Sequence, residues 1–379
     1  MSAPFNQEKE IHIKEKEYEV YYMPYRGSLK DRLYFKYGEK FSLIRKALSF
    51  LELLRQNFTT KAVPFSNLHQ KAEQLINKDD SIKKLIITGN PFVCFQFGYL
   101  LKRKFSAIEW IADYRDDWTT TELIQKRGIL QNLLHFLDRK SEKKWVSSAK
   151  FITSVSKHYA DKIGNFVGKK GYELLNGHSE EIKRTSDLAS TPGQFTITYN
   201  GSLYKTQKIE PFLDVFKSLT DHYKNKLNLH INFPGLGFDK EQEQRVRLNL
   251  KNYEKHFTIT NRIDREQVLQ IQRDSNLLLM IAHENLKGVP SSKLYEYIGL
   301  GMPILLYPDD GDIIRKTLLD TGLGIICNSS REIENNLLKL IDEFIRTGKI
   351  DITGNPEKMQ LYSAKEQVKN LAQLLDRLS

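Results

Sequence analysis

The chain has 379 residues, a length that predicts two domains. Hydrophobic residues make up 40% of it and aromatic residues 11%, so we expect substantial buried cores and exclude a largely disordered or low-complexity chain. The longest apolar runs are shorter than the roughly 20 residues of a membrane-spanning helix, and the polar start MSAPFNQEKE is not typical of a signal peptide.

Cysteine content and charge limit the cellular compartment and the kinds of partner that we expect. Cys94 and Cys327 lie far apart and beside no histidine, which argues against a disulfide framework or a zinc site and favours reducing cytoplasm. Of the net charge of +11, an excess of 10 lies within residues 1–192. This basic half indicates a nucleic acid, an anionic membrane surface or an anionic substrate as partner, with charge for solubility alone as the alternative. Nucleic acid is the least favoured, because no recognised binding module is present.

Short β-branched runs alternate with segments of helical length from about residue 80 onward. The first strand candidates are KKLIITGNP, AIEWIADYRDDW, AKFITSVS and YELLNGH. After a small, polar segment at 185–193, typical of an interdomain linker, the candidates are FTITYNGSL, LNLHINFPGLG, FTITNRI, NLLLMIAH, MPILLYP and GLGIICN. This alternation predicts an α/β chain with two Rossmann-like domains.

The two ends of the chain differ from this pattern. Residues 1–26 contain no glycine and show charged alternation instead of the apolar strand and glycine-rich turn that usually open such a domain. The first βα unit is therefore not recognisable: either the first sheet is built differently, or the chain begins downstream of where related chains begin. At the other end a terminal helix is predicted by the spacing of Val368, Leu371, Leu374, Leu375 and Leu378.

Four stretches resemble family 4 of the retaining glycosyltransferases, which have the GT-B architecture. They are WIADYRDDW, similar to an Asp-x-Arg-Asp-x-Trp element of bacterial surface-polysaccharide members, LLNGH, YNGSLYKTQK and SSKLYEYIGLGMPIL. The resemblance implies an acceptor-binding domain at 1–190 and a nucleotide-sugar-binding domain at 191–360, facing a cleft, with a helix at 361–379 that packs back on the first domain. It also implies transfer with retention of configuration, no cofactor and no metal.

The donor site is predicted from the segment VPSSKLYEYIGLG without help from the family. Ser291 or Ser292 is a natural N-cap, and the free N–H groups and positive end of the following helix can bind a diphosphate. Glu296 lies about one turn after Ser292 on the same face, within reach of the ribose hydroxyls. The alternative is a solvated helix carboxylate, but Tyr295 and Tyr297 flank Glu296 in a run expected to be buried, where a carboxylate needs partners.

Cations for the diphosphate are predicted in the loop after TITYN. Family spacing favours Lys208, with Lys205 as a second candidate, and a merely solvated lysine is the alternative for each. The resemblance often places arginine after Gly201, where this chain has Ser202, so Lys293 is expected to replace part of that charge.

A second departure from the family concerns the sugar. The first of two motif glutamates would stand at Gly288, and Glu284 lies four residues too early, so we expect backbone around Gly288 to Ser291 to contact the sugar hydroxyls. Three further donor-site candidates follow strand ends, where a tight turn or main-chain groups can approach the nucleotide: Gly235, Arg262 and Ile263.

The acceptor side is predicted at the carboxyl end of the strand AIEWIADY, the edge where open α/β sheets place ligands. Asp113 or Asp116 is expected to orient an acceptor hydroxyl, and Arg115 to hold an anionic group. The alternative is an Asp–Arg ion pair that fixes the loop, with Trp118 as packing. The acceptor-side candidates are Asn90, Trp118 and Asn176.

No metal site is expected. Asp310-Gly-Asp312 matches the Asp-x-Asp metal motif of the other glycosyltransferase architecture, but it precedes a helical run, IIRKTLL, where Asp312 is better interpreted as an N-cap. None of the histidines forms a pair at metal-ligand spacing.

Two basic amphipathic stretches, 41–58 and 129–145, mix Leu and Phe with Lys and Arg as interfacial helices do. The commoner alternative is a core-facing helix with a basic outer face. Combined with the basic first half, the pattern suggests peripheral attachment of a cytoplasmic protein to the inner face of the cell membrane.

We therefore expect a glycosyltransferase that moves a sugar from a nucleoside diphosphate to a glycan or lipid-linked acceptor in bacterial surface polysaccharide biosynthesis. Two alternatives remain. One is a nucleotide-sugar 2-epimerase of the same architecture, which needs cleft carboxylates and histidines that the sequence does not reveal. The other is a catalytically degenerate partner subunit, favoured by the missing first glutamate and first strand.

Overall fold

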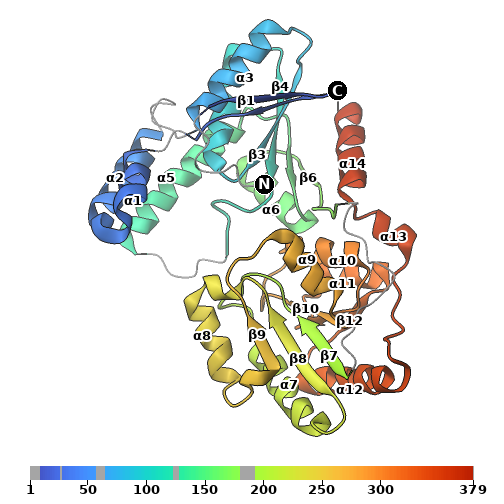
Figure 1. The fold of residues 1–379 in the computed structure, drawn as a ribbon. Coiled ribbons are helices and arrows are strands. Elements are labelled where there is room, and N and C mark those ends of the chain that lie inside the picture. Colours follow the sequence, from blue (N-terminus) through green and yellow to red (C-terminus); the bar gives the residue numbers. More distant parts are fainter. Residues whose placement is uncertain (1–8, 26–27, 57–64, 123–127, 180–192, 379) are drawn as a thin grey trace. The chain divides into compact units, whose positions relative to one another are not determined.

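The computed structural model describes residues 9–25, 28–56, 65–122, 128–179 and 193–378, and the chain forms two compact units, Met1–Glu173 and Leu174–Ser379 (Figure 1). Each unit is built on a parallel sheet, and every strand predicted from residue 84 onward is present. The predicted α/β fold with two Rossmann-like parts is thus confirmed. The predicted linker and the 190/191 boundary fall on residues 180–192, which lie outside the described part of the chain.

The first unit has a four-stranded sheet in the order β3-β4-β5-β6. Its strands are β3 (Lys84–Gly89), β4 (Glu109–Tyr114), β5 (Ile152–Ser154) and β6 (Gly171–Glu173), and its helices include α3 (Ser66–Lys78), α4 (Phe95–Lys104), α5 (Ile129–Val146) and α6 (Lys157–Val167), with the short helix η3 (Phe92–Cys94). The core is rich in aromatic side chains: Phe95 and Trp110 are fully buried. Gly98 leaves room for Trp110, because a Cβ there would lie 2.6 Å from the indole ring.

The region before Lys84 forms a hairpin and helices. Strands β1 (Ile11–Lys14) and β2 (Glu19–Tyr22) pair antiparallel as a separate sheet, and α1 (Leu29–Tyr37), η1 (Gly38–Phe41) and α2 (Ser42–Gln56) follow. β1 is exposed along its whole length, which explains why its sequence alternates charges rather than burying one apolar face. Among the described residues of this region no strand joins the parallel sheet.

The second unit has a six-stranded sheet in the order β12-β11-β10-β7-β8-β9. Its strands are β7 (Gln194–Thr198), β8 (Asn228–Phe233), β9 (Phe257–Ile259), β10 (Leu277–Ile281), β11 (Ile304–Tyr307) and β12 (Gly324–Ile326). Its helices are α7 (Glu210–Tyr223), α8 (Lys240–Asn249), α9 (Arg265–Arg273), α10 (Ser292–Leu300), α11 (Ile313–Thr321), α12 (Ser330–Thr347), α13 (Pro356–Gln360) and α14 (Ala364–Arg377), with η4 (Leu236–Phe238) and η5 (Glu254–His256).

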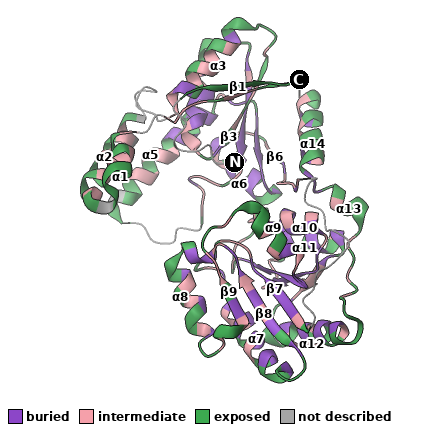
Figure 2. Ribbon diagram, viewed as in Figure 1, coloured by how far each residue is buried: buried purple, intermediate pink, exposed green. Residues whose placement is uncertain are grey.

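Both faces of this second sheet are covered. Apolar side chains of α7 and α12 form one core with the strands, and those of α10 and α11 form another, so that alternate residues of β10 belong to different cores. Figure 2 shows the strands as the most buried elements of the unit. The order of the strands reverses between β7 and β10, and in open α/β sheets ligands bind at such a switch point, outside the carboxyl ends of the strands.

The predicted terminal helix is α14. The segment before it pairs with the stretch after β6: the His178 amide donates to the Tyr362 carbonyl at 3.0 Å, and the Ala364 amide donates to the His178 carbonyl at 2.8 Å. Gly177 permits this approach, because a Cβ on it would lie 2.5 Å from the Ala364 nitrogen. The return of the helix to the first domain stays a prediction. No helix in the described residues combines the length and apolar character needed to cross a membrane.

Candidate functional site

The candidate donor site lies at the switch point of the second unit. A cavity of about 310 Å³ opens there, between the loop after β7, the start of α10 and the stretch after β6. It is lined by Gly177, His178, Ser179, Asn200, Arg265, Ser292, Lys293 and Glu296. The structure thus brings together three predicted donor residues, Ser292, Lys293 and Glu296, with a histidine and an arginine that sequence reasoning missed.

The N-terminus of α10 faces this cavity. Ser291 is the N-cap, and its hydroxyl accepts a hydrogen bond from the Lys293 amide at 3.3 Å, so Ser291 rather than Ser292 is the capping residue. Ser292 is the first residue of the helix and lines the cavity. The positive end of a nine-residue helix therefore lies beside the cavity, where it favours an anionic ligand.

Glu296 is held by two amides. Its Oε1 accepts hydrogen bonds from Gln272 Nε2 at 2.8 Å and from Asn200 Nδ2 at 3.2 Å. Tyr297, buried beside it, accepts a hydrogen bond from the Asn200 main-chain amide at 2.9 Å. Among the described residues no hydrogen bond reaches the other carboxylate oxygen, Oε2, of this half-buried side chain. Glu296 is therefore a fixed carboxylate at the cavity wall with one oxygen available to a ligand.

Lys293 lies across the loop that follows β7. Its Nζ donates to the Ser202 carbonyl at 2.9 Å and to the Tyr199 hydroxyl at 3.1 Å, and it lies 4.3 Å from the centre of the Tyr199 ring. Gly201, with a φ of 81°, leaves space for this side chain, because a Cβ there would lie 3.2 Å from Lys293 Cε. Burial lowers the pKa of the Lys293 ammonium to about 7, and the Glu296 carboxylate opposes that shift.

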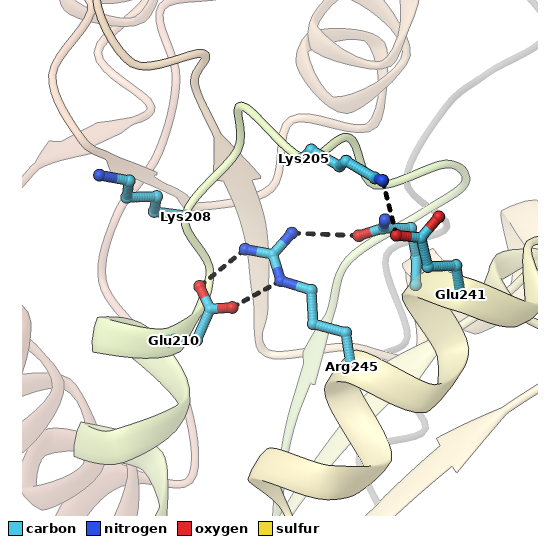
Figure 3. A pocket seen from close by; sticks show the side chains of 6 residues that line it. Lys205, Lys208, Glu210, Glu241 and Arg245 are labelled. Atoms are coloured by element: carbon cyan, nitrogen blue, oxygen red, sulfur yellow. Dashed lines mark hydrogen bonds and ion pairs between the residues drawn. The ribbon is translucent and has the colours of Figure 1, made fainter.

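Lys205 and Lys208 line a different cavity, of about 530 Å³, shown in Figure 3. Lys205 pairs with Glu241 at 2.7 Å, and Lys208 pairs with Glu284 at 2.7 Å. The pairing raises the pKa of both lysines. Neither residue lines the cavity that holds Glu296, so the structure does not bring the expected phosphate lysines together with the expected ribose carboxylate.

Arg245 of α8, which sequence reasoning missed, stabilises the loop that carries these lysines. Its guanidinium bonds both carboxylate oxygens of Glu210, at 2.5 and 2.7 Å, and the main-chain carbonyl of Gln207 at 2.9 Å. Figure 3 shows it between Glu210 and the chain segment of Lys205. No local motif marks this arginine, because its partners lie about 35 residues away in the sequence.

The remaining donor candidates lie in neighbouring loops. Gly235 has a φ of 84°, and its amide donates to Thr260 Oγ1 at 3.2 Å. The Arg262 guanidinium lies 3.7 Å from the centre of the Phe238 ring, and Ile263 is partly buried beside it in sequence. These contacts give the loops after β8 and β9 a defined geometry without showing a ligand.

The loop before α11 differs from the prediction. Asp312 occupies the N-cap position, but its carboxylate accepts a hydrogen bond from the Gly288 amide at 2.7 Å instead of capping the helix. Asp310 does the capping, accepting from the amides of Ile314 and Arg315 at 2.9 Å each. Asp312 thus stands at the predicted N-cap position, but its carboxylate reaches a distant amide and leaves the helix amides to Asp310. Within the described residues no group of three His, Cys, Asp or Glu side chains is placed to hold a metal ion.

In the first unit, Asp113 at the end of β4 is buried and fully engaged. Its carboxylate accepts from Thr153 at 2.7 Å, Arg115 Nε at 2.9 Å and Thr88 at 3.0 Å. The Asp–Arg ion pair anticipated as the structural alternative is therefore present. Asp116, in contrast, is exposed.

Trp118 stacks on Phe92 with ring centres 5.3 Å apart and lies 5.8 Å from the ring of Trp145. These contacts agree with packing as its role. The two asparagine candidates differ in position: Asn90 is exposed after β3, and Asn176 is partly buried after β6.

A second buried carboxylate, Glu142, contacts the residues that flank this motif, and sequence reasoning did not predict it. Glu142 of α5 is fully buried, accepts a hydrogen bond from the Tyr114 hydroxyl at 3.0 Å and also bonds the Thr119 hydroxyl. It thereby fixes the residues on both sides of the segment Arg115 to Trp118. Burial raises the pKa of the Glu142 carboxyl to about 7, against the opposing hydrogen bonds of Thr119 and Tyr114.

Comparison with solved structures finds similar folds. HepE from Anabaena, in a complex with UDP and glucose, is 12% identical and has a TM-score of 0.57, with 82% of each chain covered. Sucrose-phosphate synthase from Thermosynechococcus elongatus is 12% identical with a TM-score of 0.56, covering 85% of this chain and 79% of that one. A glycosyltransferase from Rickettsia africae is 12% identical with a TM-score of 0.54, covering 83% and 82%. No protein-family model matches the chain, and no curated protein matches its sequence.

Proposed function

We propose that this protein is a glycosyltransferase of the GT-B type that transfers a sugar from a nucleoside-diphosphate sugar. The observation that carries the proposal is the cavity at the switch point, where the N-terminus of α10, the Lys293 ammonium and the Glu296 carboxylate meet. A helix N-terminus and a cation suit a diphosphate, and a fixed carboxylate suits ribose hydroxyls. The folds of HepE and of the Rickettsia glycosyltransferase agree with this assignment.

The chemistry that we propose is leaving-group stabilisation. Positive charge at the cavity offsets the negative charge that grows on the departing diphosphate, and the acceptor is held in position for transfer. Retention of anomeric configuration and independence of a metal are part of the proposal and follow from the resemblance to family 4.

The acceptor is proposed to be a glycan or a lipid-linked precursor of bacterial surface polysaccharide, reached at the inner face of the cell membrane. Support comes from apolar side chains exposed on the basic helices of the first unit: Leu43 and Ile44 of α2 are 79% and 53% exposed, and Ile129 of α5 is 93% exposed. A core-facing helix with a purely basic outer face would not expose them. Apolar and cationic side chains mixed on one exposed surface are typical of interfacial helices.

A thermal-shift panel of UDP-, GDP-, dTDP- and CMP-sugars tests the proposal. A sugar nucleotide at about a hundred times its dissociation constant stabilises the protein by about 2.7 kcal/mol, which moves the melting temperature by several degrees. The absence of any shift would contradict the proposal. It would favour the degenerate partner subunit, which the carboxylate pairing of Lys205 and Lys208 and the glycine at 288 also fit.

A further inference from the structure

We propose that Lys293 is the cation that binds the donor diphosphate, and that it takes up a proton from solvent as the nucleotide binds. The inference rests on the proposed function and adds to it the residue that binds the diphosphate and the uptake of a proton on binding. Its starting point is the difference between Lys293 and the two lysines of the loop after β7. Lys205 and Lys208 each have a carboxylate partner, whereas no carboxylate lies within ion-pair distance of Lys293 among the residues that the structure describes.

The position of Lys293 is suited to an anion. It is the second residue of α10, so its side chain starts from the positive end of the helix and lines the cavity together with Ser292 and Asn200. Its Nζ donates to two neutral oxygens among the described residues, the Ser202 carbonyl and the Tyr199 hydroxyl. A phosphate oxygen is a stronger acceptor than either of them and can replace one.

The surroundings also explain why a proton moves. Burial favours the neutral amine of Lys293. The charged or titratable groups around it are Glu296 on the same helix, Tyr199 just after β7, His283 after β10, and Arg265 and His178 in the cavity wall. Only Glu296 among them carries a negative charge near neutral pH. A bound diphosphate brings negative charge next to Lys293 and therefore favours its ammonium form over the neutral amine. A group with a pKa of about 7 is about ten parts neutral to one part charged near pH 8, so binding there consumes nearly one proton.

The test is calorimetry on the full-length protein with UDP, GDP and dTDP as probes, followed by the tightest of them. Titrations near pH 8 in two buffers of different ionisation enthalpy measure proton uptake, since the terminal phosphate of a nucleotide, with a pKa of about 6, is already ionised there. We expect uptake approaching one proton by the wild type, and affinity that falls as the pH rises above about 7.

Two variants and a control complete the test. Lys293→Met should weaken nucleotide binding about 10- to 100-fold, as expected for a lost charge-assisted hydrogen bond, and should abolish proton uptake. Lys293→Arg, charged at every accessible pH, should bind the nucleotide without proton uptake. Lys339→Met, on the exposed face of α12, makes the same charge change away from the cavity and should behave as wild type.

Outcomes separate the inference from the function on which it rests. If the wild type binds a nucleotide but Lys293→Met binds it equally well, or if wild-type binding takes up no proton near pH 8, the inference is wrong and the proposed function stands. If none of the three nucleotides binds the wild type, both are overturned.

Discussion

The Arg245 guanidinium of α8 and the Glu210 carboxylate at the start of α7 form a bidentate ion pair, with distances of 2.5 and 2.7 Å. The same guanidinium reaches the main-chain carbonyls of Gln207 at 2.9 Å and Tyr204 at 3.3 Å. One side chain thus connects two helices to the loop after β7. The conformation of that loop, and with it the Ser202 carbonyl that holds Lys293, depends on a residue outside the donor cavity.

Arg245→Lys tests this dependence. A lysine cannot form the bidentate pair or reach several acceptors in fixed directions, so we expect the free energy of unfolding to fall by about 1 to 3 kcal/mol and nucleotide affinity to fall severalfold. Urea unfolding and calorimetry with UDP, GDP or dTDP measure the two effects. Arg247→Lys is the matched control, since Arg247 lies on the same helix, half exposed, and pairs with Glu243. Unchanged affinity in Arg245→Lys would show that the loop does not need this anchor.

Glu296→Ala should weaken nucleoside-diphosphate binding by about 1 to 3 kcal/mol, the cost of a lost charge-assisted hydrogen bond to ribose. The fold should persist with a lower melting temperature, because the buried Gln272 amide loses its acceptor. Calorimetry compares the variant with wild type and with Glu357→Ala, which removes an exposed carboxylate on α13. Equal affinity in all three proteins would remove Glu296 from the site.

Transferase activity should persist in excess EDTA. The proposed leaving-group charges are the α10 N-terminus and Lys293, while the Asp310 and Asp312 carboxylates are occupied by main-chain amides. The measurement is product formation from the sugar nucleotide identified by thermal shift, with and without chelator. Complete loss of activity that manganese or magnesium restores would show that the reaction needs a metal.

Glu142→Gln should stabilise the protein near pH 8 but not near pH 5. Burial raises the folded pKa of Glu142 to about 7 from 4.5, so between these values the folded state holds a proton that the unfolded state releases, and stability declines as the pH rises. Glutamine resembles the protonated acid and does not ionise. The difference in unfolding free energy should therefore grow from near zero to at most about 3 kcal/mol.

Urea unfolding of both proteins across this range is the measurement. Glu357→Gln provides the control, because its carboxylate is exposed on α13. A difference between wild type and Glu142→Gln that stays constant with pH would mean that Glu142 does not titrate in this interval.

The protein should bind anionic vesicles through the first unit. Each Lys or Arg close to such a surface contributes about 1 kcal/mol, so sedimentation with phosphatidylserine vesicles should exceed that with neutral vesicles and should decrease with salt. Replacing both Leu43 and Ile44 by serine should reduce binding, whereas Leu319→Ser, which changes an exposed leucine of α11 in the second unit, should not. Equal partitioning to both lipids, or none at low salt, would favour a soluble acceptor.

The sequence predicted the parallel sheets well because most of their strands are short runs rich in aliphatic side chains, each followed by a segment of helical length. It did not predict the hairpin of β1 and β2, because β1 buries neither face and lacks the usual apolar periodicity. The amphipathic stretch 41–58, in contrast, did indicate a helix, and α2 lies there.

In the site, a local motif sufficed to predict a serine cap at Ser291 or Ser292 and the positions of Lys293 and Glu296 at the cavity. Contacts made by residues distant in sequence could not be predicted in this way. Gln272 donates to Glu296, and Glu142 accepts from Tyr114, which follows Asp113. Each of these pairs comes together only when several strands are in register. The same holds for Asp312, whose short-range interpretation as a cap was natural and whose actual partner, Gly288, lies 24 residues away.

Gly201 and the side chain of Lys293 lie in close contact. A methyl group on Gly201 would lie 3.2 Å from Cε of Lys293, the carbon next to the ammonium. The two positions are therefore not independent in any effort to alter donor preference. A side chain at residue 201 would require Lys293 to shift, and a shorter side chain at residue 293 would leave space beside the glycine. Exchanges in this part of the loop have to be designed as pairs.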